Sequence, residues 1–349
     1  THADFAPWCA HCVAGKGRED AHNRTTESQA KLDAPAEVEM DFQFYSRDGE
    51  LVEEESKLVT VLTAVDKSSG WPLSIQVPRK GSDQYIVKAL EQYLRLLGHA
   101  KILLRYGHEG ELEALARKVQ TLIGSDRIQV QQAPRYSSSS LGAVENMNGY
   151  LASQIRTWLA DLKSRYPEGR IDVNHQVFLW LVCHVAWLAA RFHVRHDGLT
   201  PHRIIKGFEY STSIVPFAET CIAKYPDLKN RSKSKPRWFK GIWAGRLEAD
   251  NSAIMLTEAG ASTVRTFRRF TEAGKDDLEA LEDARGLPWS PQQGARVRKA
   301  TRLKSLPAPS LEKPPSQEEV NEAERGMSDQ RKEELHFAPS ILRQMPKLK

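Results

Sequence analysis

The first clearly patterned stretch of the chain, "VEMDFQFYS", alternates apolar and polar residues with the period of a β-strand. Its apolar face carries Val38, Met40, Phe42 and Phe44. Asp41 lies on the opposite face, together with Gln43. Two further apolar runs, "KLVTVLTAVD" and "WPLSIQVPR", are joined by the turn-forming residues "KSSG". Three consecutive strands with such links predict an antiparallel meander.

Helix and strand patterns alternate after this meander. The segment "SDQYIVKALEQYLRLLG" predicts an amphipathic helix that is capped by Ser82 or Asp83 and ends at Gly98. "KILLRY" predicts a strand, "EGELEALARKVQTLIG" a second helix and "RIQVQQA" a fifth strand. A serine-rich loop then opens a long helix, and two more helices follow. The order predicts an α/β fold, a mixed sheet flanked by helices.

The two ends of the chain differ from this central part. Residues 1–24 are rich in Cys, His and Gly, and residues 25–36 are polar like a linker. Residues 213–275 contain four short apolar runs with Gly and Asp-Asn turns, which predict a small C-terminal β-barrel-like domain. Residues 276–349 are charged and poor in apolar side chains, so we expect a mostly disordered tail. The predicted core is therefore 37–212.

Composition restricts the function only loosely. The net charge is +5 and the isoelectric point is about 8.9, which allows a nucleic-acid partner without requiring one. Four cysteines in 349 residues are no disulfide framework, so we expect a reducing, intracellular compartment. No apolar run approaches the ~20 residues that span a bilayer, so no membrane partner is expected. The start "THADF" has no signal peptide and no Met, and it suggests a piece of a longer chain.

Four blocks, taken in order, resemble the integrases of Ty1/copia-type retrotransposon polyproteins, whose retroviral-type catalytic domain has an RNase H-like fold. The blocks are "THADFAPWCAHCVAGKGREDAH", the three-strand meander, "SSSSLGAVENMNGYLASQIRTWL", and "GLTPHRIIKGFEY" with "PRWFKGIWAGR". They resemble the end of a zinc-binding segment, the first three strands of the core, the loop and helix with the family glutamate, and the end of the core with the small domain after it.

The resemblance implies a metal-dependent DNA strand transferase that acts in DNA integration. In this family three carboxylates hold two Mg²⁺ or Mn²⁺ ions, which activate the attacking oxygen and stabilise the leaving oxygen. The first carboxylate position falls on Asp41 and the last on Glu145, in the first turn of a helix. The middle position, at the end of the fourth strand, falls on Gly107. The sequence departs from the family there, which puts catalysis in doubt.

Neighbouring residues offer weaker substitutes for the missing carboxylate. His108 is a poor ligand for Mg²⁺ but accepts softer metals, and Glu109 could reach inward if the turn relaxes. Asp66 precedes "KSSG", where a turn cap is the better interpretation. His184 and His193 lie on an apolar helix, where core histidines with satisfied hydrogen bonds are expected.

Two further sets of residues are candidates for binding. His2, Cys9 and Cys12 fit three of the four ligands of a zinc site. The resemblance places the fourth, a histidine, before Thr1, so the site is incomplete here unless His11 or His22, which are more simply surface histidines, replaces it. The basic segment "KNRSKSKPRWFK" could neutralise DNA phosphates or could simply be a solubilising loop. Its cations are Lys229, Arg231, Lys233, Lys235 and Arg237. Trp238 and Trp243 are expected to pack in the small domain.

Two hypotheses remain open from the sequence. The chain is an integrase-like DNA-binding protein, nuclear and homo-oligomeric if functional, whose strand transfer is impaired at Gly107. Alternatively, it is a catalytically dead polyprotein fragment that acts only as a DNA- or protein-binding module. The sequence does not decide whether the chain is an enzyme.

Overall fold

A computed structural model of the chain describes residues 34–46, 58–78, 83–134, 138–226, 232–271 and 274–291. The predicted zinc ligands His2, Cys9 and Cys12 lie outside these residues, as do Lys229 and Arg231. All of the described residues belong to one compact unit.

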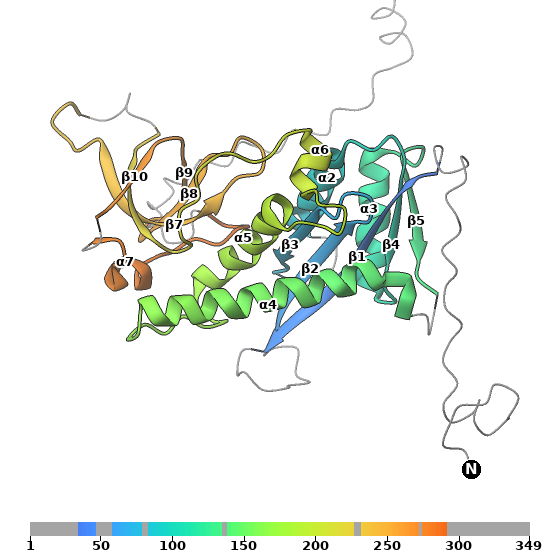
Figure 1. The fold of residues 1–349 in the computed structure, drawn as a ribbon, viewed down its shortest axis with the longest axis horizontal. Helices are drawn as coiled ribbons and strands as arrows, with labels where there is room; N and C mark the ends of the chain where they lie inside the picture. The colour runs from blue at the N-terminus through green and yellow to red at the C-terminus, as the bar shows by residue number, and fades with distance from the viewer. Residues whose placement is uncertain are drawn as a thin grey trace, which may run out of the picture. The chain divides into compact units, whose positions relative to one another are not determined.

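The first sheet has five strands in the order β3-β2-β1-β4-β5 (Figure 1). β1 pairs antiparallel with β2, and β2 with β3, whereas β4 runs parallel to β1 and to β5. The strands are β1 (Ala36–Ser46), β2 (Leu58–Asp66), β3 (Pro72–Gln76), β4 (Ile102–Tyr106) and β5 (Ile128–Gln132). The predicted meander and the two parallel additions are therefore confirmed, and the sheet is mixed.

The alternation along β1 sorts its side chains onto two faces. Val38, Met40 and Phe42 are buried in one hydrophobic cluster with residues of β4 and of the helices over that face. Phe44, expected on the same face, is 39% exposed because it lies near the end of the strand, beyond that cluster. Burying the three inner side chains contributes about 1.5–3 kcal/mol each and fixes which face Asp41 occupies.

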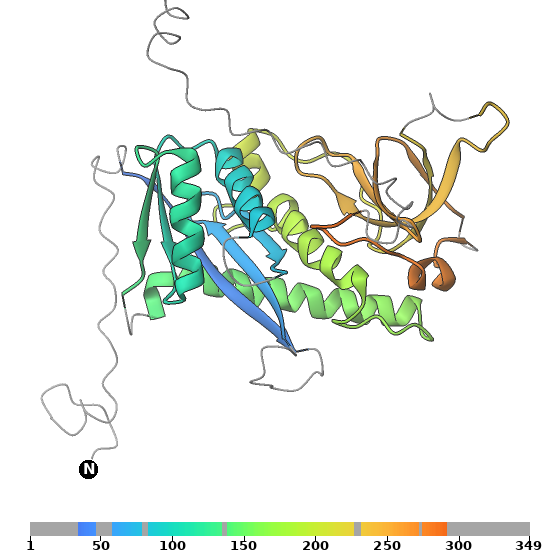
Figure 2. The ribbon, with the colours of Figure 1, turned by 180° about the vertical axis from the view of Figure 1, so that it is seen from behind.

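Helices cover both faces of this sheet. α2 (Gln84–Leu97) and α3 (Gly110–Ile123) pack on one face, as the view from behind shows (Figure 2). α4 (Gly142–Arg165) and α5 (Gln176–Phe192) lie on the other, followed by the short α6 (Pro201–Lys206). Asp83 rather than Ser82 caps α2, since its side chain accepts from the N–H of Tyr85, and Gly98 ends it in the left-handed conformation.

A second sheet follows the helices, in the order β10-β6-β7-β8-β9. All its pairings are antiparallel. Its strands are β6 (Thr220–Lys224), β7 (Trp238–Arg246), β8 (Ala253–Thr257), β9 (Gly260–Val264) and β10 (Phe267–Arg269). The run "STVRTFRRF", expected to be one strand, is divided between β9 and β10. Ile242, Ala244 and Leu256 belong to the same hydrophobic cluster as the inner face of α5, so α5 packs against both sheets.

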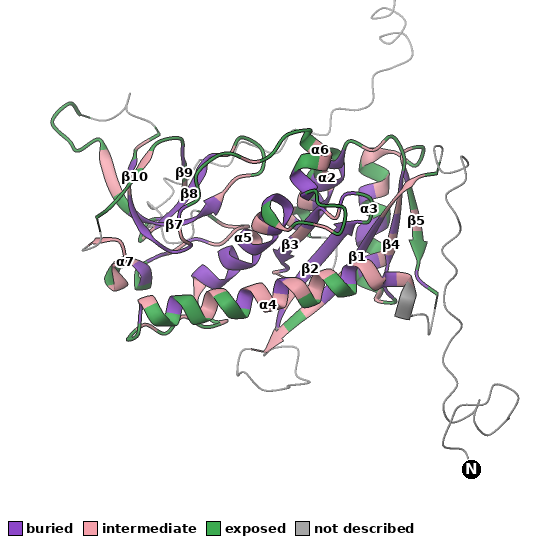
Figure 3. Ribbon diagram, in the orientation of Figure 1, coloured by how far each residue is buried: buried purple, intermediate pink, exposed green. Residues whose placement is uncertain are grey.

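The ordered fold extends beyond the predicted boundary at 275. α7 (Leu278–Glu282) buries Leu281, and the indole of Trp180 donates to the carbonyl of Gly286 at 2.8 Å. The sequence missed this because a few apolar anchors suffice to hold a polar segment on an existing core. Buried residues concentrate in the strands and on the inner side of α5 (Figure 3). Among the described residues, no helix is long and apolar enough to cross a membrane.

Candidate functional site: two carboxylates and a glycine

The polar face of β1 runs along the first turns of α4. Glu39 accepts hydrogen bonds from the backbone N–H groups of Ala143 and Val144. Further along the strand, the side-chain amide of Gln43 donates to the carbonyl of Asn148 at 3.3 Å. Asp41 lies between these two contacts on the same face, because side chains alternate along a strand.

β4 brings Gly107 to the same place. The parallel register pairs Met40 with Tyr106, so the residues that follow them, Asp41 and Gly107, lie side by side. A Cβ atom placed on Gly107 would lie 3.2 Å from Oδ1 of Asp41 and 3.8 Å from a methyl carbon of Leu141. The backbone of Gly107 is not left-handed, so nothing in its conformation demands a glycine.

Glu145 lies in the first turn of α4 and is exposed. Burial raises the pKa of the Asp41 carboxyl above its usual range, and the negative charge of Glu145 raises this pKa further, against a hydrogen bond from the backbone of Phe42. Glu145 belongs to the stretch of α4 that passes over Asp41, because the side chains of Glu39 and Gln43 on either side of Asp41 bind backbone groups of residues 143, 144 and 148. The fold thus brings Asp41, Gly107 and Glu145 together.

The two substitutes from the sequence lie on the turn between β4 and α3. His108 is exposed. Glu109 occupies the N-cap position of α3, where its carbonyl accepts from the N–H groups of Leu112 and Glu113. Its backbone is therefore fixed by the helix, which opposes the relaxation that an inward movement would need.

The residues present do not fit the two-metal site that the resemblance implies. Asp41 and Glu145 supply two carboxylates, and Gly107 supplies none. Across the described segments, no group of three or more His, Cys, Asp or Glu side chains could hold a metal ion. Mg²⁺ is bound by a few protein oxygen atoms together with water and substrate phosphates. One carboxylate fewer therefore removes a large part of the ligands that the protein itself would supply.

Glu39 was missed by the sequence analysis. Its side chain is 1% exposed, and Lys67 lies 3.3 Å from its Oε1. The signal was available, since Glu39 falls two positions before Asp41 on the polar face of the strand. Nothing in the sequence, however, says that α4 would start directly over it.

Asp66 is a turn residue, as predicted. It is fully buried and accepts hydrogen bonds from the backbone and hydroxyl groups of Ser68 and Ser69. His99 lies 3.1 Å from its Oδ2. These donors lower the pKa of Asp66 despite the opposing effect of burial, and Asp66 in turn raises the pKa of His99.

The prediction for His184 is only half right. The ring is buried, but neither nitrogen has a hydrogen-bond partner among the described residues. Four aromatic side chains surround it, with ring centroids 5.2–5.9 Å away: Trp158, Trp187, Phe217 and Trp243. Burial, with the charge of Arg191, lowers the pKa of His184 to about 3. His193 is half-buried at the end of α5, against Tyr150.

The described part of the basic segment is exposed. Lys233, Lys235 and Arg237 all face solvent before β7 begins. Trp243 is fully buried in the cluster of the second sheet, as expected, whereas Trp238 is half-buried. The three cations are available to an anionic partner.

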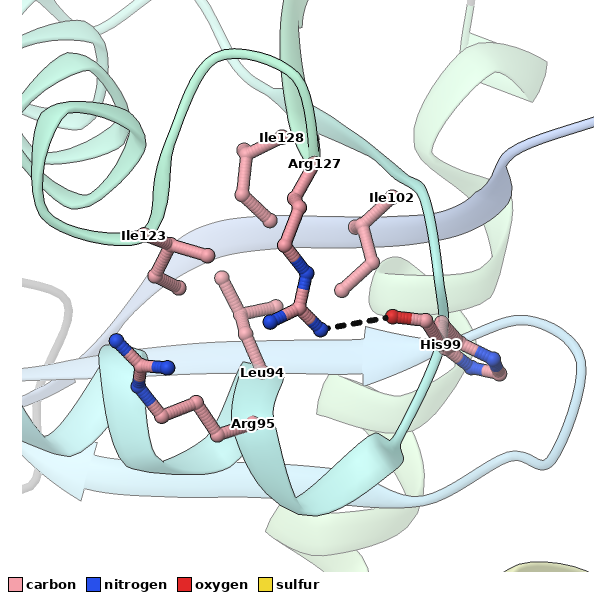
Figure 4. A pocket seen from close by; sticks show the side chains of 7 residues that line it. All are labelled: Leu94, Arg95, His99, Ile102, Ile123, Arg127 and Ile128. Carbon is pink, nitrogen blue, oxygen red and sulfur yellow. Dashed lines mark hydrogen bonds between the residues drawn. The ribbon is translucent and has the colours of Figure 1, made fainter. Parts of the chain in front are cut away.

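A small hollow lies at the opposite end of β4 from Gly107 (Figure 4). Its lining residues are Leu94, Arg95, His99, Ile102, Ile123, Arg127 and Ile128. Arg127 donates to the carbonyl of His99 at 3.2 Å, and Arg95 is paired with Glu91. Both guanidinium groups therefore make local contacts, and the hollow is no part of the site around Asp41.

Comparisons with solved structures return integrases. The chain is similar to a simian T-cell lymphotropic virus intasome solved with the PP2A regulatory subunit B56 gamma, at TM-score 0.37 and 16% identity over 68% of this chain and 79% of that one. It is also similar to the HTLV-2 integrase catalytic core in complex with magnesium, at TM-score 0.36 and 17% identity over 49% of this chain and 96% of that one. The BIV integrase catalytic core gives TM-score 0.34 and 12% identity, over 48% and 93%.

No protein-family model and no curated protein sequence matches the chain.

Proposed function

We propose that the chain is an integrase-like DNA-binding protein of a Ty1/copia-type retrotransposon, by descent a metal-dependent DNA strand transferase. Its catalysis is impaired because Gly107 stands at the second carboxylate position. The proposal is carried by the proximity of three positions: Asp41 in the middle of β1, Gly107 directly after β4, and Glu145 in the first turn of α4. DNA, a homo-oligomeric state and a nuclear location belong to the same proposal, and Mg²⁺ or Mn²⁺ belongs to it once a carboxylate stands at position 107.

The test restores the absent side chain. Gly107→Asp adds a carboxylate beside Asp41, and the ordinary backbone conformation of Gly107 accepts it after a shift of a few tenths of an ångström by Asp41. We expect Mg²⁺- or Mn²⁺-dependent joining of labelled duplex oligonucleotides to rise above that of the unmodified chain. Gly107→Asn is the matched control, since it has the same shape without the charge.

Two substitutions test whether any joining activity depends on the carboxylates of this site. Asp41→Asn and Glu145→Gln should each abolish whatever Gly107→Asp gains. Robust joining by the unmodified chain that neither substitution removes would contradict the assignment. A Gly107→Asp chain that is no more active than Gly107→Asn would contradict the role given to position 107.

The second candidate function is a non-enzymatic DNA- or protein-binding module. It is favoured by the missing carboxylate together with the exposed cations Lys233, Lys235 and Arg237. Phosphate contacts release counterions, so the affinity for duplex DNA should fall steeply as salt rises. Replacing all three cations by Ala should reduce the slope of log K against log salt by about 3.

A matched control replaces three exposed lysines outside this segment: Lys88, Lys101 and Lys163. It removes the same net charge, so a change of slope equal to that of the first triple variant would show that the overall charge, not the segment, binds DNA. Absence of binding at low salt would contradict the binding-module function. Binding indifferent to Mg²⁺ would favour it over the transferase.

A further inference from the structure

Glu39 is a charged residue in an interior position. Its side chain is 1% exposed, and both carboxylate oxygens contact a hydrogen-bond donor or a cation. Oε2 accepts from the N–H of Ala143 at 2.9 Å and from the N–H of Val144 at 3.0 Å. Oε1 lies 3.3 Å from Nζ of Lys67. Burying a carboxylate is tolerated only with such partners, so the contacts explain how Glu39 can occupy this place.

α4 has no cap of its own. The residue at its N-cap position is Leu141, which has no side-chain oxygen to offer. The first N–H groups of a helix find no acceptor inside the helix and are usually bound by a nearby Ser, Thr, Asp or Asn. Glu39 does this from β1, and its negative charge also suits the positive end of the helix dipole.

We propose that Glu39 is a positioning residue, which fixes the first turn of α4 on β1 and so holds Glu145 beside Asp41. Glu145 directly follows Val144, so a shift of the amide groups that Glu39 binds also shifts Glu145. The functional meaning of this placement rests on the proposed integrase-like site, while the contacts themselves do not.

The chain offers a matched control in Glu37. This residue stands on the same face of β1, and its carboxylate also binds Lys67, at 2.7 Å, and Arg105, at 3.3 Å. Glu37→Ala therefore removes the same charge and disturbs the same lysine as Glu39→Ala. The contacts of Glu37 run to the turn after β2 and to β4, so its loss leaves the cap of α4 in place.

The first measurement is amide hydrogen exchange in the full chain. In Glu39→Ala we expect the amides of Ala143 and Val144 to exchange about tenfold faster, because their acceptor is gone. Glu39→Gln should recover much of the protection, since its amide oxygen can still accept, and Glu37→Ala should leave exchange unchanged. Unchanged exchange in Glu39→Ala would overturn the proposal.

The second measurement asks whether the fixed turn matters to the site. In the Gly107→Asp chain, Mn²⁺ binding is titrated by the electron paramagnetic resonance signal of the free ion. The titration is done under conditions in which all of the variants are folded. Adding Glu39→Ala should weaken Mn²⁺ binding by about tenfold, as is usual when groups that orient ligands are lost. Glu39→Gln should recover the affinity. A role in stability alone would leave the affinity of the folded chain unchanged, which overturns the proposal.

The two measurements test the proposed function of the site and the positioning role of Glu39 separately. If the Gly107→Asp chain binds no Mn²⁺, the proposed function of the site fails whatever Glu39 does. In that case the exchange experiment alone decides whether Glu39 fixes α4 on β1.

Discussion

The junction of β1 with α4 and the buried side of α5 both contain ionisable side chains, but the surroundings of these side chains are opposite in character. At the junction, Glu39 and the nearby Asp66 receive several hydrogen bonds each. On the buried side of α5, His184 is surrounded by aromatic rings. Neither of its ring nitrogens has a hydrogen-bond partner in the described part of the chain. The first region surrounds its buried carboxylates with hydrogen-bond donors, whereas in the second region burial disfavours the charged form of the ring.

The two regions also contain histidines whose pKa values move in opposite directions. His99 lies against Asp66, and this pairing raises the pKa of His99. The pKa of His184 falls to about 3, because burial disfavours the charged ring and Arg191 repels it. The same side chain thus responds to pH with opposite sign, according to whether the fold places an anion beside it.

The largest expected effect concerns acid. The unfolded chain protonates His184 near pH 6.5, whereas the folded chain resists protonation down to about pH 3. Stability from this residue is therefore present above 6.5 and falls as pH falls below it, by about 1.4 kcal/mol per pH unit and so about 3 kcal/mol over two units. Urea unfolding of the parent and of His184→Leu, at several pH values, measures the difference in slope.

The comparison of the two chains is its own control. Carboxylates titrate in both chains, so their contribution cancels in the difference between the two pH dependences of the unfolding free energy. Equal acid sensitivity of the parent and His184→Leu would mean that His184 finds a partner or a proton in the folded chain. The contrast between the two regions would then be lost.

A smaller effect is expected at the junction. Glu39→Ala leaves two amides of α4 and the ammonium of Lys67 without their carboxylate, so it should lower the free energy of unfolding by about 2 kcal/mol. Urea unfolding at neutral pH measures it. Glu37→Ala, whose carboxylate is 31% exposed, should cost well under half as much. Equal losses in the two variants would show that Lys67, not the cap, provides the stability.

The smallest effect concerns His99. Its raised pKa means that the pair with Asp66 is fully charged below pH 6.5 and loses its contribution as pH rises through the folded pKa. The His99 side chain is 22% exposed, so solvent screens the pair and we expect about 0.5 kcal/mol. His99→Gln should remove this dependence between neutral and alkaline pH, as thermal unfolding can show. If the parent, but not His99→Gln, became more stable as pH rises over this range, the pair of His99 and Asp66 would not stabilise the fold in its charged form.

The sequence was sufficient for what depends on local pattern. Alternation at Val38, Met40 and Phe42 predicted which face of β1 carries Asp41, and Gly98 predicted the end of α2. Local pattern does not fix the register between β1 and β4, and the expectation that positions 41 and 107 share one site came only from the resemblance to integrases.

Other features depend on which parts of the fold meet. Glu39 caps α4 only because that helix begins over β1, and a strand pattern contains no information about a helix about a hundred residues later. His184 has no partner because Phe217 and Trp243 pack around it from a segment far along the chain. For the same reason the order of residues 276–291, held by Leu281 and by the bond from Trp180, was not visible in their composition.

Gly107 has a consequence for how this chain can change over generations. It has the ordinary backbone conformation of any residue, and space for a side chain remains beside it once Asp41 yields slightly. A glycine codon that ends in a pyrimidine becomes an aspartate codon through one base change. A carboxylate at position 107 is therefore one mutational step away, within a fold that already has room for its side chain.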